Sequence, residues 1–189
     1  VCFVPDVLRP LASLTSTLGE EASIRLLLDL ESSEMPGVRC GEQPLREALT
    51  NLLDNALKYC AESTAPQLPP RSTRLLAVSC GWDDDSQRVR IDVWNTADPL
   101  GGDELGRAFE WGFRGAAAEA GGVDGSGIGL SIVQQLVQLL GGKVELANRP
   151  MADWAWNRCL DEAGRADDDD ARLSVPPMGV NAQVLLPRA

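Results

Sequence analysis

Residues 45–59 read LREALTNLLDNALKY, and this stretch decides the fold of the chain. Its apolar residues recur at intervals of three and four positions, the period of an amphipathic helix, and they predict a helix over residues 43–60. The stripe consists of Leu45, Ala48, Leu49, Leu52, Leu53, Ala56 and Leu57. The polar residues share the opposite face, namely Glu47, Asn51, Asp54, Asn55 and Lys58. Asparagine is a poor helix former, so a pair of asparagines on one face favours a binding function over a merely solvated surface.

A second feature is the glycine-rich stretch GSGIGL at residues 125–130, which runs directly into a predicted helix over residues 128–140. Glycines at alternate positions let backbone N–H groups approach an anion, and a helix N-terminus adds favourable partial charge. The stretch is not a Walker A loop, because no Gly-Lys-Ser or Gly-Lys-Thr follows it. It is not a dinucleotide-binding fingerprint either, because no strand immediately precedes it. Such loops are common, so this one alone predicts no more than an anion site.

Helices and strands are predicted in mixed order along the rest of the chain. A helix over residues 6–22 carries Leu8, Leu11, Leu14 and Leu18 at helical spacing. The remaining pattern predicts strands at 24–30, 75–80, 89–93, 143–147 and 180–186, a short helix at 103–109, and loops at 61–74 and 112–129. Successive strands lie close enough for antiparallel pairing. We therefore expect a single domain over residues 1–189, an α/β (α+β) two-layer sandwich in which helices cover one face of a mixed, mostly antiparallel sheet.

Composition restricts the partners. The formal net charge is -11, from 28 acidic and 17 basic residues, which argues against a nucleic-acid ligand. No apolar run approaches the roughly 20 residues that a membrane span needs, and no signal peptide is recognisable, so we expect no direct membrane contact.

The widely spaced cysteines include no CxxC pair, which argues against structural zinc and favours a reducing compartment; they are Cys2, Cys40, Cys60, Cys80 and Cys159. Small buried hydrophobes are the simplest role for them, and a redox-sensing thiol is the alternative. The chain contains no histidine, which excludes imidazole as a base, metal ligand or phosphoacceptor within it.

Taken together and in this order, the motifs resemble those of one family. Residues 45–59 closely resemble the N box of sensor histidine kinases, and FEWGFRG at residues 109–115 resembles their F box. GSGIGLSIV at residues 125–133 is similar to their G2 box. LGGKVEL at residues 140–146 and the closing strand at residues 180–187 also match, so the resemblance covers nearly the whole chain. It implies the ATP-binding catalytic domain of a sensor histidine kinase, in the superfamily shared with gyrase and heat-shock chaperones.

The resemblance implies a role for each polar residue of the N box. Asn55 would coordinate a Mg²⁺ ion that bridges the phosphates of ATP, with Asn51 beside it, since a neutral amide oxygen suits a hard cation next to a triphosphate. Lys58 would supply a positive charge to the phosphates, which completes an expected catalytic set of Asn51, Asn55 and Lys58. Tyr59 would pack against the adenine. Glu47 opens the box, with a structural or metal-adjacent role.

The resemblance also assigns the glycine-rich stretch and the segment before it. Gly125, Gly127 and Gly129 would line the phosphate tail of the nucleotide, together with Ile128 and Leu130 of the same loop. The ATP lid of the family joins the F box to the G2 box, which places it at residues 112–124 here. Few large apolar residues occur in this segment, as expected of a lid that orders when nucleotide binds.

The adenine box departs from the family pattern. The family usually shows Asp-x-Gly-x-Gly, with the aspartate accepting a hydrogen bond from the adenine amino group. This chain has Asn95, Ala97 and Asp98 in that region. An Asn95 carbonyl still accepts the bond without charge assistance, at a cost on the order of 1 kcal/mol, and Asp98 is a candidate to stand in.

Residues 148–178 have no counterpart in a compact member of the family, and we interpret them as an insertion before the last strand. They contain Trp154 and Trp156, the acidic run at residues 167–170 and Pro176-Pro177. A solvated, disordered loop is the favoured interpretation. The alternative is a partner-docking element built on the tryptophans, since exposed aromatic residues often anchor interfaces.

The implied function is to bind Mg-ATP and donate its γ-phosphate to a histidine on a separate dimerisation and phosphoacceptor domain, in two-component signalling. Expected partners are that upstream helical domain and a response regulator, within a homodimeric full-length protein in the cytoplasm or the chloroplast stroma. The first alternative is a degenerate nucleotide-binding (pseudokinase) module that signals by docking. The second keeps the fold and changes the acceptor, as in serine kinases of anti-sigma antagonists or the ATPases of gyrase and chaperones, but the F box and lid length favour a histidine kinase.

Overall fold

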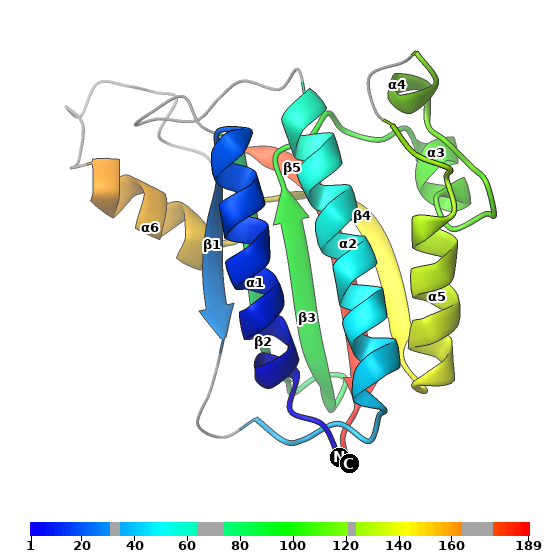
Figure 1. Cartoon of the computed structure of the whole chain (residues 1–189). Helices are drawn as coiled ribbons and strands as arrows, with labels where there is room; N and C mark the ends of the chain where they lie inside the picture. Colours follow the sequence, from blue (N-terminus) through cyan, green and yellow to red (C-terminus); the bar gives the residue numbers. More distant parts are fainter. Residues whose placement is uncertain (31–34, 64–73, 121–123, 164–175) are drawn as a thin grey trace.

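The computed structural model of the chain describes residues 1–30, 35–63, 74–120, 124–163 and 176–189. Its centre is a five-stranded sheet in the order β1-β2-β3-β5-β4 (Figure 1). The strands are β1 (Ile24–Leu30), β2 (Arg74–Asp83), β3 (Arg88–Asn95), β4 (Lys143–Pro150) and β5 (Met178–Pro187). The β1–β2 pair is parallel and the other neighbours are antiparallel, which confirms the predicted mixed, mostly antiparallel sheet.

Three long helices cover one face of this sheet, as predicted. They are α1 (Val4–Glu21), α2 (Glu42–Glu62) and α5 (Gly129–Leu139), which lie side by side in Figure 1. The apolar stripe of α2 forms the centre of the core, with Leu45 and Leu49 fully buried. Helix α5 ends as its Gly-Gly pair predicts: Gly141 has φ +72°, and the Gly142 N–H donates to the Val137 carbonyl at 2.8 Å. No helix within the described residues is long and apolar enough to cross a lipid bilayer.

The leucines that predicted α1 divide between its buried and exposed sides, with Leu8 fully buried and Leu11 packed against the core. Leu14 and Leu18 are 60% and 47% exposed, whereas Ala12 and Gly19 are buried. A Cβ on Gly19 would lie 3.0 Å from the Ile24 carbonyl oxygen, so the close approach of α1 to its neighbours requires small residues there. The periodicity correctly predicted the helix; in its second half the small residues, and not Leu14 and Leu18, mark the contact.

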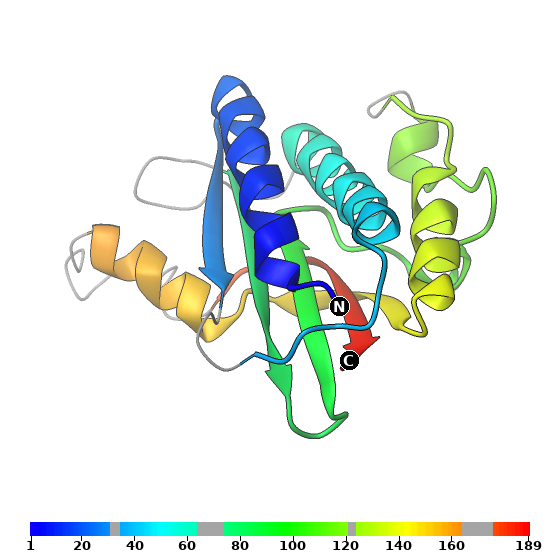
Figure 2. The ribbon, with the colours of Figure 1, turned by 60° about the horizontal axis from the view of Figure 1, so that its bottom comes forward.

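A sixth helix corrects the prediction for residues 148–178. Strand β4 continues to Pro150, and residues Asp153–Ala163 form helix α6. This helix packs on the opposite face of the sheet from α1 and α2 (Figure 2), where Trp156 is only 6% exposed and Ala155 fully buried. The far-face core comprises Leu27, Leu75, Ala77, Trp94, Met151, Ala155, Trp156 and Cys159, with Trp154 packed against it. A solvated loop and an exposed docking tryptophan are therefore both wrong for the described part of this segment; residues 164–175, including the acidic run, lie outside the described residues.

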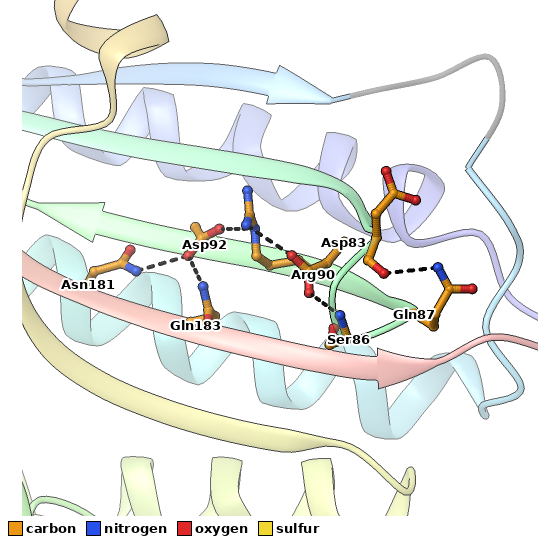
Figure 3. Close-up of polar contacts among 8 residues, drawn as sticks. Asp83, Ser86, Gln87, Arg90, Asp92, Asn181 and Gln183 are labelled. Carbon is orange, nitrogen blue, oxygen red and sulfur yellow. Dashed lines mark hydrogen bonds and ion pairs between the residues drawn. The ribbon is translucent and has the colours of Figure 1, made fainter.

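Next to this second core, the open face of the sheet is polar. The Asp92 carboxylate accepts hydrogen bonds from Asn181 Nδ2 at 2.9 Å and Gln183 Nε2 at 3.0 Å, and it pairs with Arg90 Nε at 3.0 Å (Figure 3). Arg90 also contacts Asp83 at 3.3 Å. These cross-strand pairs satisfy the polar side chains that alternate with core residues along β3 and β5.

Candidate functional site

Adjoining cavities lie between α2, the sheet and residues 96–130. The larger has a volume of about 350 Å³, within the range of small-molecule sites. The smaller, of about 300 Å³, lies over the start of α5. They adjoin each other and share the lining residues Asn55, Tyr59, Ala108, Phe113, Ala118 and Leu130.

The polar face of α2 supplies one wall, and Asn55 lies where the cavities meet. No hydrogen bond joins the Asn55 amide to another of the described residues, so both its donor and acceptor are available to a ligand. The Asn51 amide instead donates to the Glu47 carbonyl at 2.9 Å, which leaves its oxygen for the smaller cavity. Lys58 lines the same cavity. Glu47 is exposed and lines neither cavity, so the structure does not bring it to the site.

The glycine-rich loop forms the opposite wall of the smaller cavity, with Ile128 and Leu130 between and after its glycines. Gly127 has φ +71°, and a Cβ there would lie 2.6 Å from the Phe113 carbonyl oxygen. A Cβ on Gly129 would approach Asn55 Nδ2 to 3.2 Å, so this glycine lets the loop lie against the N-box amides. A Cβ on Gly125 would meet nothing within 4 Å. Among these three glycines, packing against backbone atoms and a positive φ require Gly127, whereas a Cβ on Gly129 would only press on the Asn55 side chain.

Apolar side chains line most of the larger cavity, including Leu52, Ala56, Val93, Leu130, Leu146 and Ala182. Asn95, Ala97 and Asp98 lie on its wall, so the structure brings all the predicted adenine-box residues to one place. Tyr59 lines it too, and burial raises the pKa of its hydroxyl above the usual 10.0, opposed by Arg114 and reinforced by Glu104. An apolar cavity with a few polar groups suits a heteroaromatic base.

Asn95 is 5% exposed, and its Nδ2 donates to the Thr96 carbonyl at 3.2 Å. That bond uses an amide hydrogen and leaves the Asn95 carbonyl oxygen as an acceptor. Thr96 in turn is fixed to β2: its N–H donates to the Leu75 carbonyl at 2.9 Å, and its hydroxyl accepts the Leu75 N–H at 3.0 Å. The backbone of the adenine box is thus firmly anchored despite its unusual sequence.

The predicted lid contains a short helix, α4 (Ala116–Glu119), and follows α3 (Gly102–Arg107). Glu104 joins them, because its carboxylate accepts the Gly101 N–H and the Ala116 N–H, both at 2.8 Å. These bonds, the Gly101 bond first, lower the pKa of Glu104 below its usual value of 4.5. Ala118 of α4 is 2% exposed and lines both cavities, so the lid covers the site. Residues 121–123 of the predicted lid lie outside the described residues.

Sequence reasoning missed several residues that shape the site. Glu104 follows the capping pattern of an acidic residue three positions after a helix N-cap, a signal that was present but not used. Asn148 gave no local signal: its amide bonds the Leu100 N–H at 2.9 Å and carbonyl at 2.8 Å across 48 residues. Arg114, in the F box, lines the smaller cavity and donates to the Ala118 carbonyl at 2.7 Å.

The donor set fits a divalent ion held mainly by a ligand. The described residues contain no group of three or more His, Cys, Asp or Glu side chains able to hold a metal alone. Mg²⁺ typically takes one or two protein oxygens and fills its octahedron with phosphate oxygens and water. The amide oxygen of Asn55 could serve as such a ligand, and Asp54 lines the same cavity.

Comparison with known proteins agrees with this geometry. Residues 40–167 match the family described as histidine kinase-, DNA gyrase B- and HSP90-like ATPases. Among curated relatives, the chain is 34% identical over 144 residues to the sensor histidine kinase AruS of Pseudomonas aeruginosa, covering 76% of this chain and 14% of that protein. It is 26% identical over 148 residues to the adaptive-response sensory kinase SasA of Crocosphaera subtropica, covering 78% of this chain and 35% of that protein.

Among solved structures, full-length ShkA in complex with AMPPNP superposes with a TM-score of 0.66 at 22% identity, covering 99% of this chain and 30% of that chain. This likeness supports the fold, and the chain spans about a third or less of the length of all of these proteins. The family match extends over most of the chain and includes the N box and the glycine-rich loop. The chain therefore belongs to the histidine kinase-, DNA gyrase B- and HSP90-like ATPase family, as a histidine kinase ATP-binding catalytic domain.

Proposed function

We propose that the chain binds Mg-ATP across the paired cavities and presents the γ-phosphate to a histidine outside this chain. The adenine would occupy the larger, apolar cavity and the phosphates the smaller one. The observation that carries this proposal is the position of Asn55, whose unbonded amide lies where the cavities join. A group at that junction faces both the base end and the phosphate end of one bound nucleotide.

The charges around the smaller cavity support the proposed orientation. Lys58 and Arg114 line it, and the 11-residue helix α5 begins beside it at Gly129, although the whole chain carries a formal charge of -11. Cationic side chains and a helix N-terminus both favour phosphate oxygens. The acidic Asp54 and Asp124 also line this cavity. Their charge opposes a bare triphosphate and is offset when Mg²⁺ accompanies it.

Bound Mg²⁺ would neutralise charge on the phosphates, and the chain's own residues would position them. Asn55 and Asn51 would orient the metal and phosphates through amide oxygens, and Lys58 would fix the terminal phosphates as a point charge. Lid closure through α4 would exclude water that competes with the acceptor. Catalysis by this chain would rest on positioning and charge neutralisation. The chain has no histidine, so the acceptor would come from elsewhere.

The acceptor we propose is a histidine on a helical dimerisation domain of the same full-length protein, with the phosphate passing on to a response regulator. The match covers 14% of AruS and 35% of SasA, which leaves room in proteins of that kind for such a domain. In this arrangement the isolated chain donates phosphate but does not phosphorylate itself on histidine, and the full-length protein acts as a homodimer.

Titration with a non-hydrolysable ATP analogue, with and without Mg²⁺, tests the proposal. We expect the wild-type chain to bind more tightly with Mg²⁺, and Asn55→Ala to lose roughly tenfold or more of the Mg²⁺-dependent affinity, as for one charge-assisted contact. Gln43→Ala, an exposed residue at the other end of α2, is the matched control and should bind like wild type. An Asn55→Ala variant with unchanged affinity in Mg²⁺ would mean that the metal lies elsewhere.

A degenerate module that signals by docking is the second candidate. The observation that favours it is the adenine box, where a neutral Asn95 replaces the usual aspartate and Ala97 is 5% exposed on the cavity wall. Absence of binding at millimolar nucleotide in the same titration, with the chain folded, would support this candidate and refute the kinase.

A further inference from the structure

Segments distant in sequence meet where α1 and α2 begin. Cys2 and Val38 form an antiparallel bridge, with the Cys2 N–H donating to the Val38 carbonyl at 2.9 Å and the Val38 N–H to the Cys2 carbonyl at 2.8 Å. Val38 also bridges to Arg188, so the first and last residues of the chain lie together (Figure 1). Backbone hydrogen bonds hold the bridge at Cys2, and Val38 anchors it in the hydrophobic core.

Two cysteines come together at this junction. The Cys40 N–H donates to the Val38 carbonyl at 3.0 Å, a γ-turn that curls the chain back toward Cys2. The same Val38 carbonyl accepts the Cys2 N–H at 2.9 Å, so one backbone oxygen holds Cys2 and Cys40 beside each other. Both cysteines are half-buried, whereas Cys60, Cys80 and Cys159 are buried in the core. Cys2 and Cys40 are thus a neighbouring pair of thiols that small molecules reach, in contrast to the other three.

We propose that Cys2 and Cys40 form a redox-active dithiol, which closes to an intramolecular disulfide by exchange with a low-molecular-weight disulfide and clamps the start of α1 to the segment before α2. Nothing in the nucleotide site uses these residues, because neither lines its cavities. This inference therefore stands apart from the proposed phosphate transfer.

The exchange proceeds in two balanced steps. The Cys2 thiolate attacks one sulfur of the small disulfide, which forms a mixed disulfide and releases one small thiolate that takes up a proton. Cys40 then loses its proton and attacks Cys2 Sγ, which closes the protein disulfide and releases the second small thiol. Two electrons pass from the cysteine pair to the small disulfide. Burial, and secondarily the neighbouring Cys2, raise the pKa of the Cys40 thiol to about 11, so Cys40 is the resolving thiol and Cys2 the attacking one.

The Cys2–Cys40 disulfide would link the segments that precede α1 and α2. One residue separates Cys2 from the start of α1, and one residue separates Cys40 from the start of α2. A covalent link there encloses α1 and β1 in one loop and fixes the entry of the chain into the core. Reduction leaves the same contact dependent on the backbone hydrogen bonds of a short bridge. The redox state of the pair thereby sets how firmly the N-terminal end of α1 is attached.

The test exposes the folded, reduced chain to glutathione and its disulfide at graded ratios, traps thiols with an alkylating reagent and maps the products by mass spectrometry. We expect a Cys2–Cys40 cross-link in the monomer, while Cys60, Cys80 and Cys159 remain alkylatable only after unfolding. The oxidised chain should melt roughly 5–15 °C higher than the reduced chain, and a dithiol reductant should reverse the shift.

Single variants supply the controls. Cys40→Ser should stop at a mixed disulfide on Cys2, and Cys2→Ser should form one on Cys40 more slowly; the double variant should show no redox-dependent melting shift. The proposal is overturned if the folded wild-type chain stays reduced or stops at mixed disulfides across the whole series of ratios. Cross-linking between two molecules instead of within one, or closure without a higher melting temperature, also overturns it.

Discussion

The Gly127→Ala substitution offers a sharp test of the phosphate loop. Gly127 has φ +71°, and a left-handed conformation costs a residue with a Cβ roughly 1–2 kcal/mol. The new Cβ would also lie 2.6 Å from the Phe113 carbonyl oxygen and 2.8 Å from the Gly112 carbonyl carbon, both backbone atoms that cannot turn aside. The loop must therefore move, and the hydrogen bond from the Gly112 N–H to the Gly127 carbonyl, 3.1 Å long, is lost at a further cost of about 1 kcal/mol.

These costs together amount to roughly 2–3 kcal/mol, which corresponds to a roughly 30- to 150-fold weaker affinity for Mg-nucleotide. The measurement is calorimetric titration with a non-hydrolysable ATP analogue in Mg²⁺. We expect the melting temperature to change little, because the loop can detach from the F box without opening the core. The loss should therefore appear in binding and not in folding.

Gly125→Ala is the matched control, since a Cβ at Gly125 would meet nothing within 4 Å and its φ is not in the left-handed region. It should bind the analogue within about twofold of wild type. Equal effects of the two substitutions, or a Gly127→Ala chain with wild-type affinity, would refute the inference that Gly127 holds the loop in its binding conformation.

Two further predictions concern the lid and the far-face helix. The Gly101 and Ala116 N–H groups lower the folded-state pKa of Glu104, so its contribution to stability is present above pH 4.5 and is lost as the pH falls through the lowered value. The protection factor of the Ala116 amide, the exchange rate of the unfolded chain divided by that of the folded chain at the same pH, should fall over that range, and Glu104→Gln should remove this pH dependence. An Ala116 exchange rate that follows pH identically in wild type and Glu104→Gln would contradict the latch. Trp156→Ala should lower the free energy of unfolding by roughly 3–5 kcal/mol in a denaturant titration, because the indole is buried. At denaturant concentrations below the unfolding transition, its nucleotide affinity should stay within about twofold of wild type, because the indole lines neither nucleotide cavity. Asn157→Ala, on the exposed side of α6, is its control, and equal stability of the two variants would argue against the far-face core.

Local periodicity predicted the elements of the sandwich because each helix and strand carries its own pattern of burial. The stripe from Leu45 to Ala56 is buried as expected, and α2 exceeds its predicted bounds by one residue at the start and two at the end. Leu14 and Leu18 of α1 are exposed although they continue the apolar spacing, because periodicity counts apolar residues and ignores size. A Cβ on Gly19 would lie 3.0 Å from the Ile24 carbonyl oxygen, so this contact favours a residue without a side chain, and no hydropathy pattern records that.

The site residues were predicted as a set by the motifs, and the structure brings all of them except Glu47 to the cavity walls. Their supporting contacts were beyond the sequence because they join distant segments. Asn148 bonds the backbone of Leu100 across 48 residues, and no local pattern indicates that pairing. The sequence interpretation of the α6 tryptophans was wrong for a related reason. Charges and prolines in a segment predict a solvated loop, and only the folded sheet shows that an apolar face is present for the tryptophans to pack against.

That far-face helix is connected to the nucleotide site through the strand between them. Successive residues of β3 point to opposite faces, so Trp94 lies in the α6 core while Asn95 lines the larger cavity. The Trp94 indole donates to the Arg149 carbonyl at 2.9 Å, one residue after Asn148, which holds the adenine-box loop. Gly179 lies against both residues: its Cβ would come within 2.5 Å of Trp94 Cζ2 and 2.4 Å of the Asn95 carbonyl oxygen. A segment that looked like an appended loop thus supports the unusual adenine box from behind. Because this support acts through the ends of β4 and β5, deleting residues 149–178 should cost nucleotide affinity, whereas truncating one α6 side chain should cost stability alone.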